Sequence, residues 1–390
     1  MSGPLSGIRV VDVTFNLLGP SATQLLGDMG ADVIKVEPPT GDANRHSGPF
    51  RSEGMSSLFM TNNRNKRSVT LDLKSQAGRE DLFALLANAD VFVHSMRASA
   101  AARLGIAYSD IEAVNPGIVY AFGAGFDQDG PKKSRPAFDD IIQGECGLVA
   151  LTQQATGRAS YVPTALVDKM VGHQLASAIT MALFHRERTG QGQEVYVPMY
   201  ESMVEFMFVD HLWGGVHQPP TGPLGYSRIL KRRPFQTLDG HICVTAINDQ
   251  QWARLFSTIE RPDLAANEKF ARLGPRNSNF DELFTIVEAE IRLKSTQEWL
   301  DLFEAADLPC GKVMSLQDLY DDPYLHETGF WVDYEHPTEG LCRTTNVTTR
   351  FSRSPGEIRL PPPVRGQHNQ DILGPLHQRK KRPAETSGTD

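Results

Sequence analysis

The sequence predicts an α/β protein in which a parallel sheet forms a large domain and a smaller α+β domain follows it. Two observations support this prediction. Short β-branched runs alternate with helical stretches over the first 200 residues, and such alternation is typical of a parallel sheet. The chain also has 390 residues, 40% of them hydrophobic, which is enough for two domains that each bury a core.

The large domain begins with a strand at residues 8–14, which are mostly β-branched and apolar. A short helix over residues 21–29 ends at Gly30 and leads into a strand over residues 32–36, which completes a βαβ unit. The later elements continue this alternation. They are strands at residues 68–73, 91–94, 118–122 and 194–198, and helices at residues 76–88 and 170–188. In such a sheet the ligand crevice lies beyond the carboxyl ends of the strands.

Composition also suggests where the domains end. We place the large domain at residues 1–200, completed by residues 345–376, and a linker at residues 201–228, where Gly and Pro accumulate. The small α+β domain at residues 229–320 is expected to contain a strand at 241–246 and helices at 249–259, 280–293 and 296–306. Ser295 and Glu298 form a capping-box pattern before the last of these helices. A return linker at residues 321–344 passes through strands, and residues 377–390 are expected to be a disordered tail.

Charge and cysteine content limit the partners and the location. The chain has 39 basic and 47 acidic residues, and no dense basic face, so we expect no nucleic acid partner. It has neither a secretory leader pattern nor an apolar run of about 18 residues, so we expect a soluble, cytoplasmic protein that does not bind a membrane. The four cysteines form no Cys-x-x-Cys pair, and we expect reduced thiols and no metal site.

Several familiar catalytic motifs do not occur in the sequence. It contains no Gly-x-Ser-x-Gly elbow, no Walker loop and no His-Glu-x-x-His motif. Gly123-Ala-Gly125 lacks the remaining spacing of a dinucleotide fingerprint, so a glycine turn is favoured there. Cys146 has no nearby His or Lys to lower its pKa, which favours core packing over nucleophilic chemistry.

Asp168 has two compatible interpretations. It follows the apolar Ala165-Leu-Val167 and immediately precedes a long helix, so it is a candidate N-cap residue. The helix amides and the helix dipole would also keep its carboxylate ionised, as an attacking carboxylate must be. Aspartate nucleophiles of this kind form acyl intermediates.

The chain resembles the class III coenzyme A transferases, of the formyl-CoA transferase and carnitine CoA-transferase type, over residues 5–376. The matching segments are Leu5-Ser-Gly-Ile-Arg-Val-Val-Asp12, Gly19-Pro20, Leu26-Gly-Asp-Met-Gly-Ala-Asp-Val-Ile-Lys-Val-Glu-Pro38, Asn65-Lys-Arg-Ser68, Leu71-Asp-Leu-Lys74, Arg103-Leu-Gly105, Arg135-Pro-Ala-Phe-Asp-Asp140, Asp168, Thr189-Gly-Gln-Gly-Gln193 and Gly366-Gln-His368. The resemblance implies a Rossmann-like large domain, a small domain, and a homodimer whose chains interlock as rings.

The resemblance also assigns roles to individual residues. Asp168 matches the family's catalytic aspartate, which exchanges coenzyme A between an acyl-CoA and a free carboxylic acid through mixed-anhydride and aspartyl-CoA thioester intermediates. No permanently bound cofactor is implied, and coenzyme A enters as a substrate. Lys74 and Arg103 are the expected phosphate partners. The residues that match the family's CoA-binding positions are Phe15, Asn16, Leu17, Leu18, Leu71, Asp72, Lys74, Ser95, Met96, Arg97 and Arg103.

The pocket for the acid is less well defined by the resemblance. Phe138, Gly225 and Arg228 are its candidates, and residues 222–225 match a loop that shields the intermediate in some members. Arg228, Arg232 and Arg233 either pair with a second carboxylate of the substrate or are solvated surface residues. The first interpretation favours succinyl-CoA or another short dicarboxylate as a substrate. The formyl-CoA enzymes carry a Gln where this chain has Asn16-Leu-Leu18, which argues against formate or oxalate.

Two alternatives remain at this stage. The first is an α-methylacyl-CoA racemase, which shares the fold and the CoA site but moves a proton through a His and an Asp. Racemases carry Gly-His-Asp where this chain has Ala137-Phe-Asp139, so one proton carrier is missing. The second is a non-catalytic CoA-binding protein, against which Asp168 and the intact CoA-binding segments argue.

Overall fold

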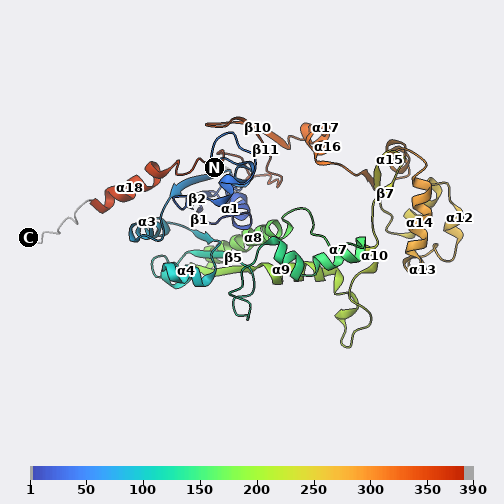
Figure 1. Cartoon of the computed structure of the whole chain (residues 1–390), viewed down its shortest axis with the longest axis horizontal. Coiled ribbons are helices and arrows are strands. Elements are labelled where there is room, and N and C mark those ends of the chain that lie inside the picture. Colours follow the sequence, from blue (N-terminus) through green and yellow to red (C-terminus); the bar gives the residue numbers. More distant parts are fainter. Residues whose placement is uncertain (1–2, 382–390) are drawn as a thin grey trace, which may run out of the picture. The chain divides into compact units, whose positions relative to one another are not determined.

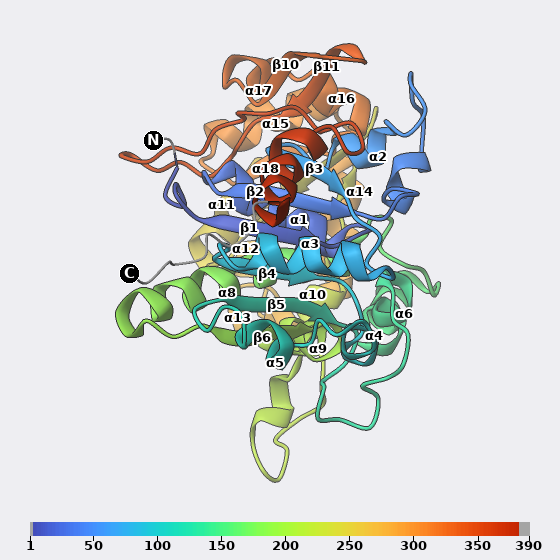
Figure 2. The same cartoon turned by 90° about the vertical axis from the view of Figure 1, so that its left-hand side faces the viewer.

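Six strands form one parallel sheet in the computed structural model, which describes residues 3–381. Their order across the sheet is β3-β2-β1-β4-β5-β6, and Figure 2 shows them one below another in this order. The strands are β1 (Arg9–Val13), β2 (Asp32–Glu37), β3 (Lys66–Thr70), β4 (Val91–His94), β5 (Val119–Ala124) and β6 (Gln193–Pro198). This is the order of a doubly wound Rossmann-type sheet, as the alternation in the sequence and the resemblance predicted.

Helices cover both faces of this sheet because neighbouring residues of each strand point to opposite sides. In β1, Val10 packs in the core of one face. The helices of that core are α1 (Leu18–Asp28), α6 (Asp139–Glu145), α8 (Leu166–Thr189) and α9 (Met199–His211). Val11 belongs to the core of the other face. The helices on that face are α3 (Gln76–Leu86), α4 (Ala98–Leu104), α5 (Tyr108–Glu112) and α18 (Asn369–Lys381).

Charged side chains are buried under the carboxyl ends of β1 and β2. Lys35 and Lys66 are both fully buried, with Nζ 2.8 Å from Asp42 and 3.1 Å from Asp12, respectively. Burial opposes ionisation of Asp12, but Lys66 and Lys35 outweigh it and hold the pKa of Asp12 below its ordinary value. The two lysines and Asp12 come from segments that carry the family resemblance, and together with Asp42 they form a buried ion network within the described part of the chain.

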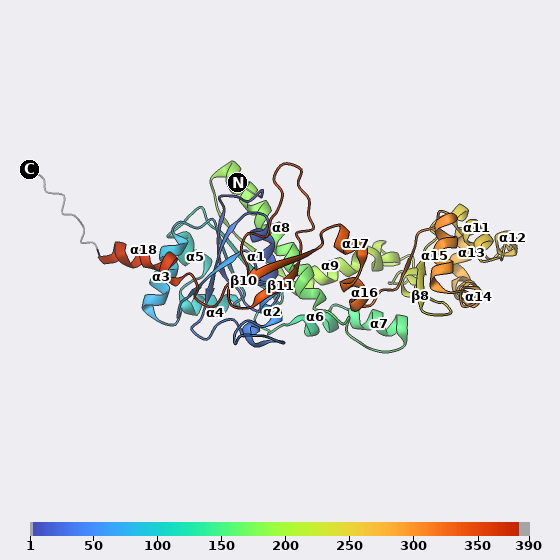
Figure 3. The same cartoon turned by 90° about the horizontal axis from the view of Figure 1, so that it is seen from above.

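The described residues divide into two compact units. The first unit contains the parallel sheet and consists of the described residues up to Ala150, residues Ser160–Met207, and the described residues from Thr328 onwards. The second unit consists of Leu151–Ala159 and Phe208–Glu327. The second unit holds an antiparallel sheet of β7 (Phe235–Gln236), β8 (His241–Val244) and β9 (Cys310–Lys312). Its core packs α11 (Asp249–Thr258), α14 (Phe280–Ile291) and α15 (Thr296–Ala305) beside that sheet (Figure 3). The predicted capping box at Ser295 and Glu298 is confirmed.

The remaining elements are short. A hairpin of β10 (Trp331–His336) and β11 (Gly340–Thr345) lies in the segment where strands were expected (Figure 1). Arg64 joins this hairpin to α1, because it forms a buried ion pair of 2.8 Å with Asp28 and donates to the Thr345 carbonyl. The others are η1 (Ala43–His46), α2 (Ser57–Met60), α7 (Leu148–Thr156), η2 (Trp213–Val216), α10 (Ser227–Leu230), α12 (Asp263–Ala266), α13 (Leu273–Ser278), α16 (Leu316–Tyr320) and α17 (Pro323–Glu327).

The C-terminal segment differs from its prediction. Residues 377–381, expected to be disordered, are the last residues of α18. Ile372 and Leu373 anchor this helix in the core, and His377 lies 2.8 Å from Asp81 of α3. The rest of the expected tail, residues 382–390, lies outside the described residues. Within residues 3–381, no helix combines the length and the hydrophobicity that a membrane crossing requires.

Candidate active site

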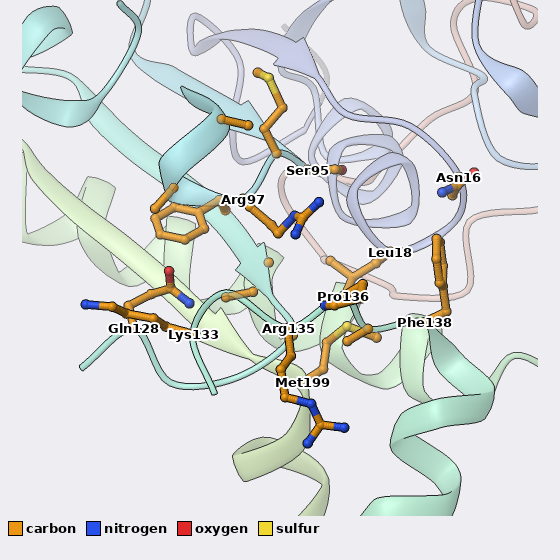
Figure 4. A pocket seen from close by; sticks show the side chains of 18 of the residues that line it. Asn16, Leu18, Ser95, Arg97, Gln128, Lys133, Arg135, Pro136, Phe138 and Met199 are labelled. Carbon is orange, nitrogen blue, oxygen red and sulfur yellow. The ribbon is translucent and has the colours of Figure 1, made fainter. Parts of the chain in front are cut away.

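A cavity of about 400 Å³ opens at the carboxyl ends of β1, β4 and β5 (Figure 4). β1 and β4 are neighbours in the sheet, but the chain leaves β1 towards β2 on one side and β4 towards β5 on the other. This reversal is the topological switch point at which ligands bind in open α/β sheets. The cavity is lined by Phe15, Asn16, Leu18, Ser95, Met96, Arg97, Ala98, Ala100, Phe122, Gly123, Ala124, Gly125, Gln128, Lys133, Arg135, Pro136, Ala137, Phe138, Asp168 and Met199.

Side chains from neighbouring segments hold the loop after β1 in place by hydrogen bonds to its carbonyl groups. Lys35 donates from Nζ to the Thr14 carbonyl at 2.9 Å, and Asn44 donates to the carbonyl of Asn16 at 2.7 Å. Asn16 has φ of 63°, a left-handed conformation that Asn tolerates better than most residues. The buried ion network therefore fixes the backbone that forms one wall of the cavity.

Two glycines let the other loops come close to β5. A Cβ on Gly123 would lie 2.6 Å from the Leu18 side chain, and one on Gly125 would lie 2.5 Å from the Ala137 Cβ. Gly123 and Ala124 are the last two residues of β5, so the turn that the sequence suggested at Gly123-Ala-Gly125 is at Gly123 and Ala124 a strand end, and only Gly125 lies beyond the strand. The glycines allow the walls that carry Leu18 and Ala137 to meet at the cavity.

Asp168 lines this cavity but does not cap the helix. α8 begins at Leu166, its N-cap residue is Ala165, and Asp168 occupies its first turn. The interpretation as an N-cap at a strand end is therefore wrong, because Leu166 and Val167 are helical and Val167 packs in the core. The backbone amide of Asp168 donates to Asp139 Oδ2 at 3.0 Å, and Gln143 donates to Asp139 Oδ1 at 2.6 Å.

This environment disfavours the charged form of Asp168. Burial, followed by the charges of Asp139 and Asp140, raises the pKa of Asp168 from its ordinary value of 3.8 to about 6. The prediction that the helix amides and the helix dipole would favour the ionised form of this carboxylate is wrong, because burial and the two neighbouring charges outweigh them. A shifted pKa in a cleft, caused by burial and by named charges, is typical of functional sites.

The basic residues around the cavity differ in their partners. Lys132 and Arg135 share Glu145, at 2.9 and 2.6 Å. Among the described residues, Arg97 and Lys133 make no ion pair, and Arg97 donates to the Ser134 carbonyl at 3.1 Å. Figure 4 shows Arg97 and Lys133 among the labelled side chains of the cavity. Two cations without carboxylate partners make the cavity suitable for an anionic ligand.

The structure brings most, but not all, of the predicted site residues together. Phe15, Asn16, Leu18, Ser95, Met96, Arg97, Phe138 and Asp168 line the cavity. Leu17 precedes α1 as its N-cap residue and is not among the lining residues. Leu71, Asp72 and Lys74 follow β3, two strands away from β1, and Arg103 lies in the last turn of α4; none of these four lines the cavity. Gly225 and Arg228 belong to the second compact unit.

Some lining residues were not predicted as part of the site. Lys133 and Gln128 lie in the long loop after β5, and Met199 begins α9. The contact between Asp139 and Asp168 was also missed, although both lie in segments that carry the resemblance. The spacing of 29 residues between them gives no local signal, because the contact depends on how α6 and α8 pack.

The sheet order and the position of the cavity define a Rossmann-type α/β protein with a ligand site at its switch point. Its family is equally clear: the chain belongs to CoA-transferase family III, whose model matches residues 5–369. It is therefore a CoA-transferase, and the predicted family and enzyme class are confirmed.

Curated relatives and solved structures agree with this assignment. The chain is 32% identical to a probable fatty acyl-CoA transferase, Rv3272, of Mycobacterium tuberculosis, over 95% of this chain and 97% of that protein. It is 32% identical to the mouse succinyl-CoA:glutarate CoA-transferase, over 95% of this chain and 86% of the relative. A crystal structure of Rv3272 superposes with a TM-score of 0.84 at 31% identity, covering 95% of this chain and 99% of that one. A CAIB/BAIF family protein from Brucella suis gives a TM-score of 0.83 at 28% identity, over 96% and 100% of the two chains.

Proposed function

We propose that the protein exchanges coenzyme A between an acyl-CoA and a free carboxylic acid, with the Asp168 carboxylate as the nucleophile. The observation that supports this most is that Asp168 lines the switch-point cavity and has a pKa raised to about 6 by burial and by neighbouring carboxylates. Such a carboxylate is about nine-tenths ionised at pH 7, and it is more basic than an ordinary aspartate. It combines a large reactive fraction with increased nucleophilicity.

Four bond exchanges complete the reaction. An Asp168 oxygen attacks the thioester carbonyl of the donor, the carbon–sulfur bond breaks, and a mixed anhydride and a CoA thiolate result. The thiolate attacks the Asp168 carbonyl of the anhydride, forms an aspartyl-CoA thioester and releases the first acid as its carboxylate. The acceptor carboxylate then attacks this thioester, and the thiolate released attacks the acceptor carbonyl of the new anhydride. The new acyl-CoA leaves and Asp168 is again a carboxylate, so no proton is gained or lost.

The walls of the cavity support this chemistry. Asp139 accepts a hydrogen bond from the backbone amide of Asp168 and thereby fixes the first turn of α8. Phe15, Leu18, Phe138 and Met199 supply apolar surface around the reacting carboxylate. Such surface limits the access of water, which would hydrolyse either intermediate.

We propose that the CoA moiety lies along the carboxyl ends of β1, β3 and β4. Phe15 to Leu18 and Ser95 to Arg97 would contact it near the cavity, and Leu71, Asp72, Lys74 and Arg103 farther from it. Lys74 and Arg103 are exposed, and neither makes an ion pair within residues 3–381. Both are thus available for phosphate groups.

For the acids, we propose short dicarboxylates, with succinyl-CoA as one donor. The relatives include succinyl-CoA:glutarate and succinyl-CoA:mesaconate CoA-transferases. Arg97 and Lys133 offer cationic groups at the cavity itself, and Phe138, 63% exposed, forms part of its edge. Gly225 has φ of 92° and remains a candidate for a shielding loop together with Arg228. A racemase would need a second proton carrier, and no histidine lines the cavity within the described residues.

We also propose a homodimer with interlocked chains and a cytoplasmic location. On α8, Met181 and Phe184 are 71% and 64% exposed, and on α9 Val209 is 84% exposed. Large apolar side chains exposed on helices favour a protein partner. Light scattering coupled to gel filtration should give twice the mass of 43.1 kDa, and a monomer would contradict the dimer. The four free cysteines fit a reducing compartment, which cell fractionation would test.

A donor and acceptor panel tests the function directly. The enzyme is incubated with succinyl-CoA, acetyl-CoA or a long-chain acyl-CoA together with free dicarboxylic or monocarboxylic acids, and the new thioesters are identified by mass. Asp168→Ala should abolish all exchange, whereas Asp140→Asn, which changes a neighbouring carboxylate outside the cavity lining, should retain it. Undiminished exchange in Asp168→Ala would refute the role of Asp168 as the nucleophile. Exchange with monocarboxylates alone would refute the dicarboxylate proposal.

A further inference from the structure

A buried hydrogen-bond chain lies directly behind the cavity wall at β4. His94, the last residue of β4, is 1% exposed, and its ring stacks on Phe122 with centroids 5.0 Å apart. The next three residues, Ser95, Met96 and Arg97, all line the cavity, and α4 starts at Ala98. His94 itself does not line the cavity.

The hydrogen bonds of this chain fix the protonation of the ring. The Met96 amide donates to His94 Nδ1 at 3.1 Å, so Nδ1 carries a lone pair. The proton of the neutral ring is then on Nε2, which donates to the Tyr120 hydroxyl at 2.8 Å. Tyr120 in turn donates to the carbonyl of Ile106 at 3.1 Å. Each donor in this series of hydrogen bonds therefore has an acceptor, and the series runs from Met96 through His94 and Tyr120 to Ile106.

The hydrogen-bond series ends at two residues that flank α4 in the sequence. Met96 lies two residues before Ala98, the first residue of the helix, and Ile106 lies two residues after Leu104, its last residue. Tyr120 is 2% exposed, so neither the imidazole nor the phenol has access to solvent that could replace these bonds. Burial lowers the pKa of His94 to about 3, which keeps the ring neutral, as its acceptor role at Nδ1 requires.

We propose that His94 is a positioning residue for coenzyme A binding: through Met96 and, by way of Tyr120, through Ile106, it holds the Ser95–Arg97 wall and α4 in place. This inference rests on the proposed role of that wall in contacting CoA. His94 touches no reacting group, so it should govern the affinity for CoA and acyl-CoA and leave the chemical step unchanged.

Two substitutions at His94 separate its roles. Asn can accept the Met96 amide through Oδ1, as Asn does when it bonds to a backbone amide two residues ahead. Phe retains the ring and the stack on Phe122 but offers no acceptor. His94→Phe should raise the KM for acyl-CoA and the Kd for CoA about tenfold, the equivalent of about 1.4 kcal/mol, because a buried amide loses its partner. His94→Asn keeps the bond to Met96 and loses only the bond to Tyr120, so it should weaken CoA binding less than His94→Phe does.

Matched controls separate positioning from loss of stability. Phe92 packs on Tyr120 in the same cluster, with ring centroids 5.4 Å apart, and its side chain has no hydrogen-bonding group. Phe92→Leu should lower the thermal stability and leave the Kd for CoA unchanged. Tyr120→Phe removes only the hydroxyl and should weaken CoA binding several-fold. In all four variants kcat should remain within about twofold of the wild type.

Two further readouts need no substrate. Amide hydrogen exchange at Met96 should be fast in His94→Phe and slow in the wild type and in His94→Asn. Nitrogen NMR of the wild-type ring at pH 5 should show a bare Nδ1 and a protonated Nε2, whereas an ordinary imidazole would be charged at that pH. A charged ring, or equal CoA affinity in His94→Phe and the wild type, would overturn the proposal. If Asp168→Ala retained exchange, the nucleophile would be refuted while the exchange rate at Met96 and the affinity for CoA would still decide the role of His94.

Discussion

Replacing Asp168 by Asn should make the protein more stable while it abolishes activity. At pH 7 the Asp168 carboxylate is mostly ionised, in a place where burial, Asp139 and Asp140 all disfavour the charge. A rise of its pKa from 3.8 to about 6 corresponds to a destabilisation of the ionised form by about 3 kcal/mol, at 1.36 kcal/mol per pKa unit. Asn has nearly the same shape and carries no charge, so Asp168→Asn should gain about 2 to 3 kcal/mol at pH 7, the lower value allowing for partial solvent contact.

The pH dependence of this gain supplies an internal control. Because the pKa is higher in the folded than in the unfolded state, the folded protein binds more protons between about pH 4 and pH 6, and Asp168 lowers stability as the pH rises through that range. Urea titrations at one protein concentration should therefore give equal free energies of unfolding for the two proteins below pH 4 and a difference of about 2 to 3 kcal/mol above pH 6. A variant that is less stable than the wild type at pH 7, or a difference that does not change with pH, would refute the electrostatic account.

Three other expectations follow from the site. Below pH 6, kcat/KM should fall about tenfold per pH unit as Asp168 is protonated. Asp139→Asn should shift this fall to lower pH, because it removes a charge that raises the pKa of Asp168. An unchanged pH profile in this variant would exclude that coupling. Lys35→Met should lower the free energy of unfolding by about 3 to 5 kcal/mol in urea, since it leaves buried carboxylates without their cation, and a loss below about 1 kcal/mol would show that the ion network is not needed. Arg97→Gln should raise the KM for acyl-CoA about tenfold and weaken its dependence on salt, and an unchanged salt dependence would argue against an anion contact at Arg97.

The sheet could be predicted from the sequence because its signals are local. β4 was predicted with both ends correct, and the other strands of the parallel sheet within a few residues, since each is a β-branched or apolar run between turn residues. The ends of the helices in the second unit were similarly close, helped by the capping box at Ser295. Local patterns of this kind depend on a few neighbouring residues, so packing with distant parts of the chain alters them little.

The site was predicted less completely because its geometry depends on contacts between distant segments. Ala165-Leu-Val167 is apolar enough to end a strand, but packing against α1 makes it the start of α8, which turned an expected N-cap into a residue of the first turn. The raised pKa of Asp168 depends on Asp139, 29 residues earlier. Lys35 lies in β2 and Lys66 in β3, where a buried lysine is unexpected, and only the folded structure shows that Asp42 and Asp12 accompany them.

The most direct test of the central claim is the mass of the peptide that contains Asp168 after reaction with an acyl-CoA donor. The enzyme is mixed with succinyl-CoA in the absence of an acceptor acid, quenched with hydroxylamine or reduced with borohydride, and digested. The account predicts a hydroxamate or an alcohol at Asp168 in the wild type, and no such change in Asp168→Asn or in a sample without donor. Modification at another carboxylate only, or continued exchange of coenzyme A with an unmodified Asp168, would contradict it.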